Sequence, residues 1–102
     1  MNKSEYQAVY DLLLTIPEGK VTTYGAIAKK LGLNPRHVGR ILHVNPDAPR
    51  VPCHRVVKSD GHLAGGYALG GNEGQRKRLV AEGVAFVGDD RVAAGSVLLH
   101  LP

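Results

Sequence analysis

Turn-forming residues divide the first 43 positions of this chain into three segments, each long enough for only a short helix. Apolar side chains recur at helical spacing in the first segment: Tyr6, Val9, Tyr10, Leu13 and Ile16. Ser4 and Gln7 form a capping box, so we predict an amphipathic helix over residues 5–16. The turn at residues 17–20 ends this helix.

The next two segments predict a pair of shorter helices. Residues 22–23 are threonines that can cap a helix over 24–31, and Gly32 stops it. The dipeptide Asn34-Pro35 supplies an N-cap and a first-turn proline for a third helix that ends at His43. Two short helices joined by a glycine-containing turn are the pattern of a helix-turn-helix, although many helical hairpins bind nothing.

The central part of the chain is strongly basic. Between residues 20 and 58 a single acid, Asp47, stands against eight bases: Lys20, Lys29, Lys30, Arg36, Arg40, Arg50, Arg55 and Lys58. We expect Arg36, His37 and Arg40 on the exposed side of the third helix. Such a surface attracts polyanions, so DNA binding is one interpretation and a solvated basic face is the other.

Length and composition limit the possible classes. The 102 residues, 43% hydrophobic, predict one compact domain over 1–102. The single cysteine excludes an internal disulfide and a multi-cysteine metal site, which fits a reducing cytoplasm. Apolar runs are short and residues 1–4 lead directly into an amphipathic segment, so we expect no membrane span and no signal peptide.

The second half of the chain contains more turn-forming residues and glycines than the first half. A turn-rich loop at 45–52 is followed by an irregular glycine-rich segment at 58–74 without a phosphate-loop pattern. A last helix is predicted over 73–82, and two short strands over 84–87 and 96–101. The expected fold is mainly α with short β segments, a winged-helix-like helix-turn-helix domain that binds DNA.

The single cysteine stands between a proline and a histidine. A thiolate is the reactive form of cysteine, so reactivity at neutral pH needs nearby cationic or proton-accepting groups, and His54 and Arg55 follow in sequence. Neighbouring side chains in an extended segment point to opposite sides, so adjacency does not prove contact. Cys53 is therefore either a nucleophile or a buried structural residue.

Several motifs, in one order, resemble those of the O6-alkylguanine-DNA alkyltransferases. They are Thr23-Tyr24-Gly25, Arg36-His37-Val38-Gly39, Asn45-Pro46, Pro52-Cys53-His54-Arg55-Val56-Val57, Gly66-Tyr67 and Glu82-Gly83. The resemblance covers about residues 4–87 and concerns the DNA-binding and active-site domain of that family.

The resemblance implies a role for each catalytic position. Cys53 would accept the alkyl group irreversibly, and His54 would take the thiol proton through a water molecule. Glu82 would orient and stabilise the charged imidazole. Tyr24 would protonate the leaving guanine, and Asn45 would tie the helix-turn-helix to the active-site loop.

It also implies how the lesion is held. The carbonyls of Cys53 and Val56 would read the exocyclic amine of the base, Tyr67 would wall the pocket, and the backbone N–H of Ala68 would face the alkylated oxygen. The target nucleotide must leave the stack, and Arg36 would fill the gap from the minor groove. Further DNA contacts are implied for four residues: Thr23, Tyr24, His37 and Arg40. The implied partner is double-stranded DNA with O6-alkylguanine, bound by a cytoplasmic monomer without metal or cofactor.

Three features depart from the family pattern. No stretch of this sequence resembles the separate N-terminal domain of full-length alkyltransferases, Ala68 stands where many members have serine, and the segment 67–82 is one residue longer than usual. The size and the tail after Glu82 resemble the alkyltransferase-like proteins, which bind alkylated DNA without repairing it and flag it for nucleotide-excision repair. Those proteins usually have tryptophan or alanine in place of the nucleophile, so alkyl transfer and lesion binding both stay open.

Overall fold

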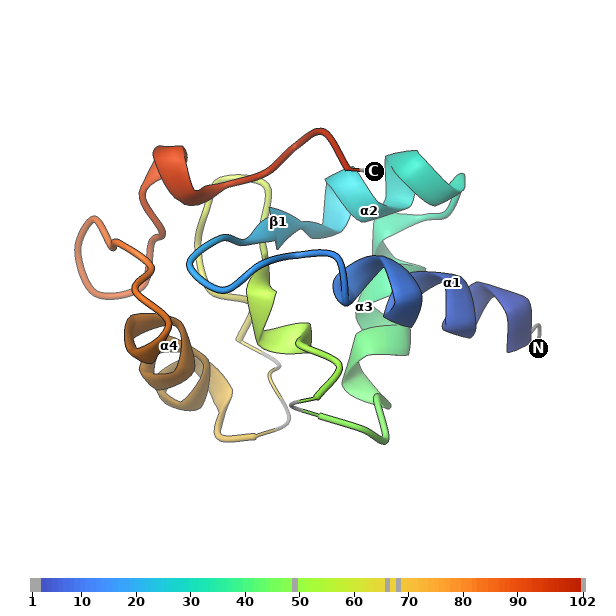
Figure 1. The fold of residues 1–102 in the computed structure, drawn as a ribbon, viewed down its shortest axis with the longest axis horizontal. Helices are drawn as coiled ribbons and strands as arrows, with labels where there is room; N and C mark the ends of the chain where they lie inside the picture. The colour runs from blue at the N-terminus through green and yellow to red at the C-terminus, as the bar shows by residue number, and fades with distance from the viewer. Residues whose placement is uncertain (1–2, 49, 66, 68, 102) are drawn as a thin grey trace.

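The computed structural model describes residues 3–48, 50–65, 67 and 69–101. Its elements are α1 (Lys3–Leu13), β1 (Thr22–Thr23), α2 (Tyr24–Leu31), α3 (Pro35–His43), the 3₁₀ turn η1 (Cys53–Arg55), β2 (Val56–Val57), α4 (Gly71–Ala81) and the 3₁₀ turn η2 (Ala94–Ser96). Figure 1 shows α1, α2 and α3 grouped at one end of the molecule and α4 at the other end. The fold is therefore mainly helical with a small sheet, as the sequence predicts.

The helix-turn-helix has the predicted bounds, because its caps are formed as expected. Thr23 Oγ1 accepts a hydrogen bond from Ala26 N at 3.0 Å at the start of α2. Gly32 ends α2 in the left-handed conformation with φ of 69°, which glycine adopts without strain. Asn34 Oδ1 accepts from Arg36 N at 2.8 Å at the start of α3.

The first helix differs from the prediction at both ends. It already includes Lys3, so Ser4 lies within the helix and not at its N-cap. It ends at Leu13, because Thr15 turns back to bond the Leu12 carbonyl through both its N–H (3.0 Å) and its hydroxyl (2.6 Å). Ile16 is nevertheless 1% exposed, so a turn and not the helix delivers this side chain to the core.

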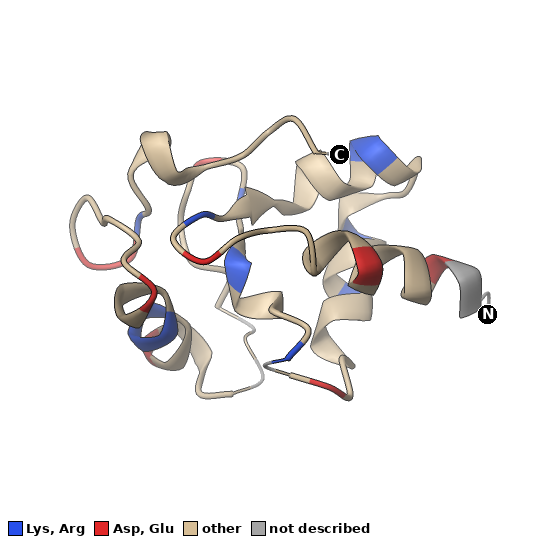
Figure 2. Ribbon diagram, viewed as in Figure 1, with Lys and Arg blue, Asp and Glu red and all other residues tan. Residues whose placement is uncertain are grey.

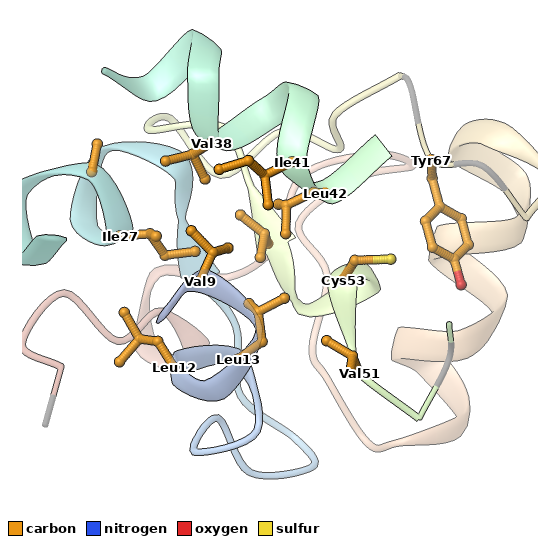
Figure 3. Close-up of a cluster of buried hydrophobic side chains, with 12 residues drawn as sticks. Val9, Leu12, Leu13, Ile27, Val38, Ile41, Leu42, Val51, Cys53 and Tyr67 are labelled. Carbon is orange, nitrogen blue, oxygen red and sulfur yellow. The ribbon is translucent and has the colours of Figure 1, made fainter. Parts of the chain in front are cut away.

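The short sheet separates two hydrophobic clusters. Strands β1 and β2 run parallel, with Thr22 opposite Val56 and Thr23 opposite Val57. Side chains alternate along a strand, so Val56 packs with helices α1–α3 while Val57 packs in a second cluster with Leu79 of α4. Figure 3 shows the first cluster, with Cys53 at its edge.

The tail does not form the two predicted strands. Within the described residues, the segments 84–87 and 96–101 contribute only single bridges, Phe86 to Val92 and Val21 to Val97. The residues that would extend the bridge at Val97 form the 3₁₀ turn η2 instead. The carbonyl of Leu98 accepts from the Thr22 hydroxyl, and its N–H donates to the Val21 carbonyl, each at 2.7 Å. The tail thus runs back toward α2 (Figure 1).

The lengths and compositions of the helices indicate whether any of them could span a membrane. Among the described residues, each helix is too short and too polar to cross a bilayer.

Candidate functional site

A cavity of about 460 Å³ lies between the helix-turn-helix and the turn that carries the cysteine. Tyr24 and Arg36 line it from the starts of α2 and α3, and Cys53 lines it from η1. Tyr67 and Gln75 line it from the glycine-rich loop and α4. Five segments between residues 24 and 75 therefore meet at one hollow, and it contains the only thiol of the chain.

The cysteine is held at the cavity by a tight turn. Cys53 is 7% exposed, and its N–H bonds the Val51 carbonyl at 2.8 Å. Asn45 Nδ2 donates to the same carbonyl at 2.9 Å, and Asn45 Oδ1 accepts from Asp47 N at 3.0 Å. Asn45 thus joins the end of α3 to the cysteine turn, where the resemblance places it. Figure 3 shows the sulfur directed toward Tyr67 and away from the aliphatic cluster.

The thiol is protonated at neutral pH. Burial raises the pKa of Cys53, and the Asn45 amide and the cationic Arg78 only partly oppose this effect. An ordinary thiol already has a pKa of roughly 8.5, so the resting sulfur keeps its proton. Reaction at this sulfur therefore needs a base.

A histidine beside the cysteine has the form of such a base. His54 is 3% exposed, and its Nε2 lies 2.8 Å from Glu82 Oε2. A carboxylate only accepts hydrogen bonds, so Nε2 bears the proton and Nδ1 is left as the acceptor. Nδ1 is buried and has no hydrogen-bond partner among the described residues. Burial lowers the pKa of His54 despite the opposing effect of Glu82, so the ring is neutral near pH 7.

Arg55 holds the carboxylate in place. Its Nε and Nη2 bond the two oxygens of Glu82 at 2.9 and 2.8 Å, and its Nη1 bonds the Ile16 carbonyl at 2.6 Å. Burial alone would raise the pKa of Glu82, but the bonds from Arg55 and His54 outweigh it and lower that pKa. From the sequence, Arg55 is known only as a residue of the motif around Cys53. Its bidentate contact with Glu82 is seen only in the structure.

Two phenols face the thiol. Burial and the nearby Cys53 raise the pKa of Tyr24 to about 12, so this hydroxyl remains a proton donor at neutral pH. Burial also raises the pKa of Tyr67, whose hydroxyl is buried without a partner among the described residues. The ring of Tyr67 lies edge-on to His54 with centroids 6.3 Å apart, so it forms a wall beside the base.

Gln75 is a site residue that the sequence interpretation missed. Its side chain is 1% exposed and bonds the carbonyls of His54 and Val56 at 3.0 and 2.9 Å. The same amide accepts from Ala64 N at 3.2 Å. A signal was present, because Gln75 lies four residues before the inward-facing Leu79 and so shares its helix face.

The residues implied in DNA contacts are not all on one surface. Arg36 and Arg40 are exposed on α3, and only Arg36 lines the cavity. His37 is less exposed than expected: its side chain is 24% exposed, and its Nε2 lies 3.1 Å from Glu5 Oε1 of α1. Thr23 is buried as the cap of α2.

Two further implied contacts concern the base. The side chain of Val56 is buried in the first cluster, and its carbonyl lies beside Gln75. Ala68 lies outside the described residues, so the structure does not place its N–H.

The charges are distributed unevenly. Figure 2 shows acidic residues along α1 and basic residues at the end of α2, on the helix-turn-helix side of the molecule. Among the described residues, no three histidine, cysteine, aspartate or glutamate side chains are grouped so that they could hold a metal ion.

Comparison with known proteins identifies relatives of this chain. The family model for the DNA-binding domain of 6-O-methylguanine DNA methyltransferase matches residues 4–84. A methylated-DNA–protein-cysteine methyltransferase of Pyrobaculum aerophilum is 54% identical over 77 residues, which are 76% of this chain and 50% of that protein. The chain thus spans about half the length of the first curated relatives it matches.

A second kind of relative matches along nearly the whole chain. The alkyltransferase-like protein 1 of Schizosaccharomyces pombe is 38% identical over 100 residues, 95% of this chain and 89% of that protein. A crystal structure of that protein with DNA containing O6-carboxymethylguanine superposes with a TM-score of 0.75 at 33% identity, covering 90% of this chain and 89% of that one. A Mycobacterium tuberculosis OGT structure with DNA gives a TM-score of 0.70 at 39% identity, over 80% and 51% of the two chains.

Proposed function

We propose that this chain, which belongs to the family of the 6-O-methylguanine DNA methyltransferase DNA-binding domain, acts in the repair of O6-alkylguanine in double-stranded DNA. Within that role we propose direct transfer of the alkyl group to Cys53. The observation that supports transfer is a buried, protonated thiol next in sequence to a neutral imidazole whose Nδ1 is an acceptor without a hydrogen-bond partner among the described residues.

The proposed step is a single displacement. His54 Nδ1 takes the thiol proton through a water molecule, and the sulfur forms a bond to the alkyl carbon as the bond from that carbon to O6 breaks. Glu82 stabilises the imidazolium that results, and Arg55 keeps the carboxylate ionised and oriented. The product is a thioether at Cys53, so each molecule reacts once.

The departing guanine takes up negative charge and needs a proton. Tyr24 supplies it from the opposite wall of the cavity, because its phenol is protonated and lies near the thiol. The carbonyls of Cys53 and Val56 accept from the exocyclic amine, and the Tyr67 ring packs against the base. The family resemblance assigns the contact with O6 to the N–H of Ala68, which lies outside the described residues.

The lesion reaches the cavity by extrusion from the duplex. The α3 helix enters the minor groove, and Arg36 fills the space that the flipped nucleotide leaves. Arg36 is the cation of α3 that is both exposed and at the cavity, which supports this assignment. Arg40 lies one turn further along α3 and contacts the phosphate backbone.

A second function is favoured by one specific observation. The match to the alkyltransferase-like protein 1 continues through the tail, beyond the residues that the family model covers. In this alternative the chain binds the lesion tightly, Cys53 reacts slowly or not at all, and a nucleotide-excision repair partner takes over.

Intact-protein mass after incubation with O6-methylguanine DNA separates the two functions. Transfer adds one methyl group in place of a hydrogen to the wild type and nothing to Cys53→Ala. Lesion affinity of Cys53→Ala should stay within about threefold, because the change removes no cation. Tight binding without a mass gain by the wild type would establish the alternative, and methyl uptake by Cys53→Ala would identify another acceptor.

A further inference from the structure

Gln75 joins three segments of the site through one buried amide. Both N–H groups of Nε2 are used, on the carbonyls of His54 and Val56, and Oε1 accepts from Ala64 N. The side chain is 1% exposed and also lines the cavity. Few side chains of α4 have such a position, since Gln75 and Leu79 are its buried residues.

The two carbonyls that Gln75 binds lie two residues apart in the sequence. His54 belongs to the 3₁₀ turn η1 and Val56 to the strand β2, so the two carbonyls lie on either side of the point where the turn becomes the strand. The amide of Gln75 therefore ties the end of this turn to the start of the strand. It sets the direction of the Val56 carbonyl more firmly than an apolar side chain could, because each hydrogen bond has a preferred angle.

A carbonyl oxygen has two lone pairs. Gln75 binds the Val56 oxygen at 2.9 Å, and the same oxygen can accept a second hydrogen bond. Gln75 itself borders the cavity, so the amide that holds the Val56 carbonyl lies at the wall against which the base would stand. A donor at the edge of the base would meet a carbonyl whose direction is already fixed.

On the basis of the proposed recognition of guanine, we infer that Gln75 is a positioning residue that aligns the Val56 carbonyl with the exocyclic amine of the base. Gln75 thereby sets the preference for alkylated guanine over an alkylated purine that lacks this amine. The side chain acts through Val56 and does not touch the alkyl group.

Two oligonucleotide duplexes test the inference, one with O6-methylguanine and one with O6-methylhypoxanthine, which differs only in lacking the amine. One hydrogen bond changes a rate or an affinity by about 3- to 10-fold, and this is the preference expected of the wild type. Gln75→Met has similar volume but no donor, so the preference should fall nearly to unity. Gln7→Met is the matched control, because Gln7 is exposed on α1 and donates a hydrogen bond to the nearby Asp11 on the same helix, away from the cavity.

The ratio of the two substrates separates positioning from a purely structural role. A structural role would slow both reactions equally and leave the ratio unchanged, which would overturn the inference. If Gln75→Met does not fold, Gln75→Leu serves instead: it also removes both donors without burying a charge, so the preference should again fall nearly to unity. A preference that persists in a folded Gln75→Leu would also contradict the inference.

Failure of the proposed transfer is recognised separately. If the wild type gains no methyl mass from either duplex, the same preference is read as the ratio of the two dissociation constants. A wild type that neither transfers from nor binds the two duplexes differently would overturn the role of Gln75.

Discussion

Glu82 accepts three charge-assisted hydrogen bonds, one from His54 and two from Arg55. Bonds of this kind are shorter and stronger than neutral ones, and here they join α4 to the cysteine turn. Arg55 extends this hydrogen-bond network to the carbonyl of Ile16, which lies in the turn after α1. The Glu82 carboxylate therefore both orients His54, the proposed general base, and holds α4 against the cysteine turn.

Glu82→Gln should slow alkyl transfer by at least about 10-fold, because general acid–base assistance contributes about 100-fold or more and the neutral amide loses both the charge that stabilises the imidazolium and the hydrogen bond from Arg55 Nε. The negative charge of Glu82 raises the pKa of His54, so its removal lowers that pKa further. The rate rises with pH as His54 loses its proton, and its acid limb should therefore move to lower pH in the variant. Single-turnover rates between about pH 5 and pH 9 measure both effects.

Asp60→Asn is the matched control for Glu82→Gln. Asp60 pairs with His62 at 3.0 Å on an exposed loop, so the same chemical change in another histidine–carboxylate pair should leave transfer unaffected. Unlike this control, Glu82→Gln also leaves the partly buried Arg55 without its countercharge and should lose about 1–3 kcal/mol of stability. Superimposable pH profiles of wild type and Glu82→Gln would remove Glu82 from the mechanism.

At the scale of the elements, α4 and the loop before it depend on one glycine. A Cβ at Gly74 would collide with the backbone carbonyl of Leu69 and approach Tyr67 Cδ2 to 3.7 Å. The carbonyl belongs to the main chain and cannot rotate away alone. The loop that presents Tyr67 to the cavity therefore packs on α4 only because residue 74 has no side chain.

Gly74→Ala should destabilise the protein by about 1–3 kcal/mol through overpacking, although alanine favours a helix by about 1 kcal/mol in an open position. Gly95→Ala is the control, because a Cβ there meets nothing within 4 Å and φ is not positive. Urea denaturation of the two variants measures the difference. If Gly74→Ala is as stable as Gly95→Ala, the loop is not held by this contact.

The two exposed arginines of α3 allow a test of the helix-turn-helix. Arg36→Ala should weaken reaction with a duplex by about 1–3 kcal/mol and leave reaction with the free base O6-benzylguanine nearly unchanged, because a free base needs no extrusion. Arg40→Ala, which removes the same charge away from the cavity, should affect the duplex less. Equal losses on both substrates would instead mean that Arg36 supports the fold.

At the scale of the whole molecule, the site lies at the junction of two hydrophobic clusters. The cluster of α1–α3 contains Cys53 and Tyr67, whereas Leu79 of α4 belongs to the cluster on the other face of β2. The network of His54, Arg55 and Glu82 crosses this junction. Its ionisation should therefore affect the stability of the folded chain and not only the reaction.

Stability should fall in two stages as the solution is acidified. The pKa of His54 is lowered from 6.5 in the fold, so below pH 6.5 the unfolded chain binds a proton that the folded chain resists, and stability decreases until the folded pKa is passed. The pKa of Glu82 is lowered from 4.5, so its contribution is complete above pH 4.5 and is lost as pH falls through the folded pKa.

Denaturant midpoints across this pH range measure the two stages. His54→Gln, which cannot gain the proton, should lack the stage that begins below pH 6.5 and keep the stage below pH 4.5. If the upper stage persists in His54→Gln, another group is responsible for it.

Local chemistry allowed much of this protein to be predicted from the sequence. The bounds of α2 and α3 follow from Thr23, Gly32 and Asn34, because a cap acts within one turn and depends on no distant residue. The motifs that occur in one order from Thr23-Tyr24-Gly25 to Glu82-Gly83 were together enough to assign the family, which the family model confirms.

Contacts between distant positions were decided by the tertiary structure, apart from that of His54 with Glu82, which the family resemblance implied. His54 and Glu82 are 28 positions apart, Arg55 reaches back to Ile16, and Gln75 spans three segments, so no spacing rule relates them. The partial burial of His37 against α1 and the path of the tail could not be predicted for the same reason, since the edge near β1 takes the hydrogen bonds of the tail. Side-chain exposure and strand pairing depend on partners that are distant in sequence, so only the folded chain determines them.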